Sequence, residues 1–326
     1  MRDITDILAK ELGVKKTHAE NVIRLIDEGN TIPFIARYRK EMHGSMDDTL
    51  LRTFETRLLY LRGLEERKEE VIRLIGEQDK LTPELKKQIE EAKVLQRVED
   101  LYKPYKKKRA TRASKAKEQG LEPLANLILL QKQMKGMPAD FGKEYIDSQK
   151  GVMTEEDALQ GACDIIAENL ADDADLLERL RNQTFQSAQI VTEAVDPEEK
   201  SVYEMYHNRS EAVSKIPNHR ILAINRGEKE KKLKVKIEPD TEKLLASISR
   251  RLIRNKESIF TGLLKDTAND AYKRLIAPSL EREVRNLLTE RAEADADQDA
   301  PGNGFDRLLA VRDAHARQHA DAREEQ

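Results

Sequence analysis

Apolar residues recur at helical spacing through most of this chain and alternate with wide charged faces. The stripe over residues 4–12 predicts a first helix, which Gly13 is well placed to end. Thr17 and Glu20 form a capping-box pattern before the next stripe, and Gly29 closes that second helix. The pattern predicts a mainly α-helical chain.

The segment from residue 30 to 48 combines apolar and basic residues. Pro33 favours the first turn of a short helix, where its missing amide leaves no hydrogen bond unmade. The apolar face of that helix would consist of Phe34, Ile35 and Tyr38. Three cations share the segment, namely Arg37, Arg39 and Lys40. Phosphate contact and the packing of two interlocked small helices both explain these residues, and the apolar spacing favours packing.

A long helix follows, which Asp47 can cap and which Gly76 ends. Its apolar stripe consists of Leu51, Phe54, Leu58, Leu61 and Leu64. The Thr-Pro pair at residues 82–83 starts another helix. Glycines and prolines then separate short apolar clusters over residues 111–181, which predicts a compact subdomain of short helices, similar to a helix-turn-helix.

Strict alternation of apolar residues and lysine over residues 233–237 (LKVKI) is the clearest strand signal in the chain. Residues 221–224 would either pair with this strand as a hairpin or belong to a helix begun at Pro217, and the sequence does not decide between the two. We expect Thr241 to cap the next helix. Two apolar stripes follow, and Pro278 interrupts the first and starts the second.

Composition adds three expectations. Charged residues make up 37% of the chain and apolar ones only 38%, so we expect narrow cores between helices. The single cysteine, Cys163, lies in an amphipathic run and is expected to be a small core residue rather than a nucleophile. The N-terminus lacks a signal-peptide pattern and no apolar run approaches the ~20 residues that span a bilayer, so we expect a cytoplasmic protein with no membrane partner.

One stretch concentrates positive charge in a chain whose net charge is −3. Residues 103–117 include eight basic residues and no acid, with a tyrosine able to stack on a base. The candidate nucleic-acid-binding residues are Lys103, Tyr105, Lys106, Lys107, Lys108, Arg109, Arg112, Lys115 and Lys117. Each cation near a phosphate releases a condensed counterion, so the stretch is typical of a polyanion contact. A solvated loop between helices explains the same charge run.

Candidate chemistry is otherwise sparse. No glycine-rich phosphate loop follows a strand, and Ser45 lacks the strand–turn–helix context of a nucleophile elbow. His315 and His319 have the spacing of metal ligands, but they lie in an acidic tail where no supporting groups are assured. We therefore expect no catalytic residues, no metal site and no cofactor.

Four ordered segments resemble the N-terminal part of the bacterial Tex proteins, which are RNA-binding transcriptional accessory factors. The segments are TIPFIARYRKEMHGSMDD (31–48), VEDLYKPYKKKRATRASKAKEQGLEPLA (98–125), SKIPNHRILAINRGEKE (214–230) and LLKDTANDAYKRLIAPSLEREVRNLLTERAE (263–293). The resemblance covers roughly residues 1–294. It implies an elongated, mainly α architecture with a helix-turn-helix-like subdomain, a small β element and a long central helix that includes residues 280–293.

We expect four parts along the chain. They are an N-terminal helical region over residues 1–110, a helix-turn-helix-like helical subdomain over 111–200, a small β element with long central helices over 201–294, and a disordered or non-family tail over 295–326. Tex proteins continue into a YqgF-type RNase-H-like domain, a helix-hairpin-helix domain and an OB-fold RNA-binding domain. None of these fits in the residues after Ala294, so the resemblance implies a truncated Tex.

The resemblance implies a non-catalytic, RNA-binding transcriptional accessory protein, or a truncated remnant of one. We expect it to contact RNA or DNA non-specifically through residues 103–117, and weakly without the OB-fold domain. The alternative is a helical scaffold that docks on the transcription machinery with no direct nucleic-acid binding.

Overall fold

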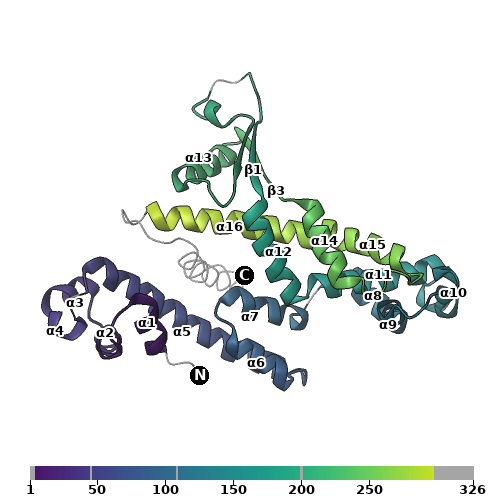
Figure 1. The fold of residues 1–326 in the computed structure, drawn as a ribbon, viewed down its shortest axis with the longest axis horizontal. Helices are drawn as coiled ribbons and strands as arrows, with labels where there is room; N and C mark the ends of the chain where they lie inside the picture. Colours follow the sequence, from purple (N-terminus) through teal and green to yellow (C-terminus); the bar gives the residue numbers. More distant parts are fainter. Residues whose placement is uncertain (1–3, 45, 108, 199–200, 297–326) are drawn as a thin grey trace. The chain divides into compact units, whose positions relative to one another are not determined.

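The computed structural model describes residues 4–44, 46–107, 109–198 and 201–296. These residues are mainly α-helical, with one small sheet (Figure 1). They form two compact units that divide between Tyr102 and Lys103. From residue 297 on, the tail predicted as disordered lies outside the described residues.

The N-terminal unit is built around one long helix, α5, whose predicted apolar stripe is buried along its length. The helices of this unit are α1 (Ile4–Leu12), α2 (Lys16–Asp27), α3 (Ile32–Tyr38), α4 (Lys40–His43), α5 (Asp48–Gly76), α6 (Pro83–Glu91) and α7 (Leu95–Tyr102). The Asp47 carboxylate accepts the Leu50 amide at 2.7 Å, which confirms the predicted cap of α5. Gly13 follows α1 with a φ of 66°, as expected of a glycine that ends a helix.

Two predicted helix starts were wrong by one or two residues. The extended residue Lys15 precedes α2 and no side chain caps this helix, so Thr17 and Glu20 lie inside it and form no capping box. Asp240, not Thr241, caps the later helix α14 (Thr241–Leu252), where its carboxylate accepts the backbone amide three residues on. A carboxylate and a hydroxyl are both good caps, and the sequence alone does not show which residue leaves the helical conformation.

The prediction that α3 buries Phe34, Ile35 and Tyr38 on one face was wrong for the two aromatic residues. Ile35 is fully buried, but Phe34 is 37% exposed and Tyr38 is 62% exposed. The buried side of this seven-residue helix consists of Ile32 and Ile35, which are three residues apart. Phe34 and Tyr38 are four residues apart and pair with each other on the exposed side, with ring centroids 5.2 Å apart.

The second unit begins with a 3₁₀ turn at Lys103–Tyr105 and contains the remaining helices of the described residues. Its helices are α8 (Arg112–Glu118), α9 (Glu122–Leu130), α10 (Pro138–Gly142), α11 (Glu155–Ala171), α12 (Ala174–Ser187), α13 (Asn218–Lys229), α14, α15 (Thr261–Asp270) and α16 (Ala277–Ala296). Short 3₁₀ turns lie at Lys143–Tyr145, Ser148–Lys150 and Glu204–Tyr206.

Helix α11 is central to the larger core of this unit, where α8, α9, α10 and α15 pack against it. Small residues permit the approach, because Ala113 and Ala116 of α8 are buried and a Cβ added at Gly161 of α11 would lie 2.3 Å from Leu121 Cδ1. Cys163 is buried in the same helix, as predicted, and burial raises the pKa of its thiol to about 11.

The sheet has the strand order β2-β1-β3, with both pairs antiparallel. Strand β3 (Leu233–Glu238) confirms the predicted strand, since its apolar residues face the core and its lysines are exposed. Its partner is β1 (Gln189–Ala194), which the sequence analysis missed, as it missed β2 (Arg209–Ala212). Residues 221–224 belong to α13 with Pro217 at its N-cap, so the helix alternative is correct.

The last helices run on without a break, because a π-helical turn at Ala271–Ile276 joins α15 to α16. Figure 1 shows this run beside the sheet and α13. Pro278 was predicted to interrupt the first apolar stripe and to start the second. The helical run is continuous there: the π-helical turn ends at Ile276, and the Ala277 amide, just before the proline, donates to the Tyr272 carbonyl. Leu280, in the α11 core, and Val284, in the sheet core, both lie on α16.

The close contact of α10 with α11 makes Gly142 a sensitive position. A Cβ there would lie 2.7 Å from the Glu155 carbonyl oxygen, a backbone atom that cannot rotate away. We expect Gly142→Ala to lower the free energy of unfolding by about 1–3 kcal/mol in chemical denaturation. Gly262→Ala is the matched control, because Gly262 lies in α15 with nothing within 4 Å, and it should gain up to about 1 kcal/mol. Equal effects of the two substitutions would contradict this packing.

An ion pair between a buried carboxylate and a half-buried arginine gives a pH-dependent prediction. The Arg274 guanidinium lies 2.9 Å from the Asp164 carboxylate; burial raises the pKa of Asp164, and Arg274 and Arg112 lower it in part. We expect Arg274→Gln to cost about 1–3 kcal/mol near pH 7, because it leaves the buried Asp164 carboxylate without that cation and also removes the ion pair with Asp270. The loss should shrink toward about pH 4. Because the pKa of Asp164 is raised in the folded state, its carboxyl there binds a proton that the unfolded chain, with its lower carboxyl pKa, binds less well. Arg52→Gln, which removes an exposed pair with Asp48, should change stability by less than about 0.5 kcal/mol.

Candidate nucleic-acid interface

The basic segment comprises residues 103–117, of which the structure describes 103–107 and 109–117. It begins with the 3₁₀ turn, residues 106–107 and 109–111 are not helical, and α8 follows. A reciprocal capping box fixes the start of α8: Thr111 Oγ1 accepts the Ser114 amide at 3.0 Å, and Ser114 Oγ accepts the Thr111 amide at 2.8 Å. Because Ala113 and Ala116 face the core, the basic residues of α8 are left on its outer side. The segment is therefore held at its helical end by packing on α11.

Several predicted binding residues are engaged in the structure. The Lys103 ammonium is half-buried and donates to the Ala171 carbonyl at 2.7 Å, where it binds the C-terminal end of α11. Arg112 is exposed, but its charge helps to lower the pKa of Asp164. Lys117 lies 3.9 Å from the Glu122 carboxylate.

The remaining predicted residues differ in exposure. Four cations are exposed, namely Lys106, Lys107, Arg109 and Lys115. Tyr105 is half-buried, and Lys108 lies outside the described residues. With Arg112 and Lys117, six of the seven cations that the structure describes in this segment are exposed.

A second basic and aromatic surface lies on α3 and α4, where the sequence analysis favoured packing. We call it the α3 surface; its residues are Phe34, Arg37, Tyr38, Arg39 and Lys40, all exposed. The Arg39 guanidinium lies over the Phe34 ring, 5.6 Å from its centroid. The signal in the sequence was the alternation of cations and aromatic residues, but helical spacing alone did not show which side of α3 is buried.

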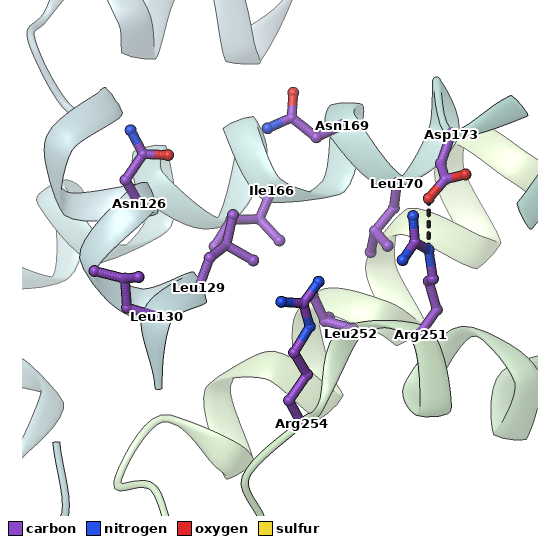
Figure 2. A pocket seen from close by; sticks show the side chains of 10 residues that line it. All are labelled: Asn126, Leu129, Leu130, Ile166, Asn169, Leu170, Asp173, Arg251, Leu252 and Arg254. Carbon is purple, nitrogen blue, oxygen red and sulfur yellow. Dashed lines mark hydrogen bonds and ion pairs between the residues drawn. The ribbon is translucent and has the colours of Figure 1, made fainter. Parts of the chain in front are cut away.

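An open groove of about 470 Å³ lies between α9, α11 and the end of α14. Figure 2 shows Asn126 and Asn169 on one side, Arg254 on the other, and Arg251 paired with Asp173 at 2.8 Å. Buried Gln131 holds one wall, because its amide donates to the Leu252 carbonyl. Of the predicted binding residues that the structure describes, none lines this groove.

Within residues 4–44, 46–107, 109–198 and 201–296, no three His, Cys, Asp or Glu side chains converge as metal ligands. The helices in these ranges are too short or too polar to span a bilayer. His315, His319 and Ser45 lie outside the described residues.

Two family models match the chain. The model described as "Tex-like protein N-terminal domain" matches residues 2–76, and the one described as "Tex central region-like" matches residues 133–298. The chain belongs to the Tex family. The resemblance drawn from the four segments is therefore confirmed. The α3 surface lies inside the first match, whereas the basic segment lies between the two.

Curated relatives extend the match to most of the chain. A Bacillus subtilis protein named YdcI is 48% identical over 292 residues, which cover 89% of this chain and 40% of the relative. The transcriptional accessory protein Tex of Neisseria gonorrhoeae is 39% identical over 316 residues, covering 95% of this chain and 41% of that protein. The human S1 RNA-binding domain-containing protein 1 is 31% identical over 312 residues, which cover 90% of this chain and 31% of that protein. This Tex-family chain thus spans about two fifths of the length of its bacterial relatives.

The different surroundings of two lysines give a test within the basic segment. We expect Lys103→Met to lower the free energy of unfolding by about 1 kcal/mol, because it removes the cation at the α11 C-terminus. It should leave unchanged the log–log salt slope measured in an RNA-binding titration. Lys115→Met should do the opposite, leaving stability unchanged and making the log–log salt slope shallower by about 0.7. Denaturation and fluorescence anisotropy measure the two effects, and a stability loss only in Lys115→Met would reverse the assignment.

Proposed function

We propose that this Tex-family chain is a non-catalytic transcriptional accessory protein that contacts RNA non-specifically through the exposed cations of the basic segment. The supporting observation is that six of the described cations are exposed on a segment without a single acid, namely Lys106, Lys107, Arg109, Arg112, Lys115 and Lys117. Such cations release counterions from a phosphate backbone without reading bases, which gives salt-dependent and sequence-independent binding.

The relatives support the biological setting. One is named a transcriptional accessory protein, and another is named for an S1 RNA-binding domain. The proposal assigns no reaction to the chain. Its cysteine is buried with a raised pKa, which disfavours the thiolate that a nucleophile requires.

The test is binding of a labelled single-stranded RNA to the full chain across a salt series. If about four phosphates are engaged, the log–log slope should be near −3, and affinity should fall about 50-fold between about 50 and 200 mM salt. Lys107→Gln/Arg109→Gln should make the slope shallower by about 1.4, because two charges are lost. Lys132→Gln/Lys135→Gln is the charge-matched control, since both lysines are exposed outside the basic segment, and it should leave the slope unchanged.

Two results would contradict the proposal. Equal effects of the two double variants would mean that net charge, not the basic segment, governs binding. No binding at low salt, together with salt-insensitive binding to purified transcription machinery, would favour the scaffold alternative instead.

A further inference from the structure

We propose that the α3 surface is a second, independent contact site for single-stranded RNA, in which unpaired bases stack on Tyr38 and Phe34. This site goes beyond the basic segment, because it lies in the N-terminal unit and adds stacking to charge. It does not depend on whether the basic segment binds.

The two aromatic rings are presented to solvent rather than used in the core. Ile32 and Ile35 already supply the buried side of α3, so Phe34 and Tyr38 are not needed to hold the helix. Their ring planes are tilted by 45° with centroids 5.2 Å apart, and the more exposed ring, Tyr38, leaves much of its surface open. An exposed aromatic pair offers π-faces to a flat partner.

Positive charge surrounds these rings. Arg37, Arg39 and Lys40 are exposed, and Glu41 is the single acid between residues 31 and 46. Arg39 lies over Phe34, so a cation and a π-face already share one place on the surface. Proteins that bind single strands without sequence preference combine cations, which contact the phosphate backbone, with aromatic rings, which stack on the bases.

The surface rests on a rigid support. The Asn21 side-chain amide donates to the Met42 carbonyl at 3.1 Å, which ties α4 to α2. Gly44 ends α4 with a φ of 64°, and a Cβ there would lie 2.0 Å from His18 Nδ1, so the backbone approaches that ring closely. Side chains on a fixed support lose less conformational entropy on binding than those on a mobile loop.

The chemistry favours a single strand over a duplex. The bases of a duplex are stacked on one another, so their faces are closed to Tyr38, and only its phosphates would meet Arg37 and Lys40. An acidic protein would also satisfy the cations, but a single strand carries a flat base beside every phosphate, which matches cations and aromatic rings on one surface.

The chain contains no tryptophan, which allows a site-specific reporter. Tyr38→Trp places one indole on the α3 surface, and Tyr105→Trp places one in the basic segment as the matched reporter. We expect a short oligoadenylate to quench the fluorescence of the Tyr38→Trp variant in a saturable manner. Inorganic polyphosphate, a polyanion without bases, should give no such quench.

Affinity of the full chain gives the second measurement. Phe34→Ala/Tyr38→Ala should weaken binding of the oligoadenylate at least about five-fold, whereas Tyr38→Phe should retain it because the ring remains. Leu59→Ala is the control for loss of an exposed apolar side chain, since Leu59 is 60% exposed on α5 of the same unit, and it should leave affinity unchanged. Circular dichroism verifies that each variant is folded.

The outcomes separate this site from the basic segment. Absence of the quench while wild-type RNA binding remains sensitive to Lys107→Gln/Arg109→Gln would overturn the stacking site and leave the proposed function standing. An equal quench by polyphosphate would overturn it as well. Loss of binding in Phe34→Ala/Tyr38→Ala alone would support the α3 surface and count against the basic segment. A protein partner lost on Tyr38→Ala, with RNA affinity unchanged, would assign the surface to protein instead.

Discussion

The close approach of short helices to α11 is the constraint on which the second unit depends. Gly161 and the alanines of α8 leave little space between the two helices, so their contact depends on dispersion between closely packed small residues. The Asp164–Arg274 pair joins α11 to the π-helical turn inside the same layer. Because the helices in this layer are closely packed, even one added methyl group is expected to lower the free energy of unfolding.

The same packing divides the cations of the basic segment into two groups. Lys103 is directed to the end of α11 and serves the fold, whereas Lys115 is directed outward because Ala113 and Ala116 occupy the inner side of α8. Charge alone does not make this distinction. The Lys103 partner, Ala171, lies 68 residues further along the chain, and no local pattern announces it.

Local signals in the sequence predicted much of the fold. Three features that depend only on residues close in the sequence were confirmed. They are the Asp47 cap, the buried stripe of α5 and the alternation in β3. Strand β1 was missed although Ile190, Val191 and Thr192 are β-branched, because its partners in β3 lie 39 to 49 residues further along the chain. The exposed side of α3 was mistaken because a seven-residue helix has two possible apolar sides, and only tertiary contact selects one.

Some of the charge in this chain joins one helix to another, so a high charged fraction does not by itself indicate a polyanion partner. Three such pairs, each at 2.7 Å, are Arg57–Glu11, Arg67–Glu99 and Arg181–Glu283. Exposed pairs add little net stability, but they disfavour packings that would separate them. The informative feature is a local excess of cations beside an aromatic ring, as at Tyr105 and at Tyr38. Charge contacts weaken with salt and stacking does not, so salt dependence and base dependence report on physically different parts of the same binding free energy.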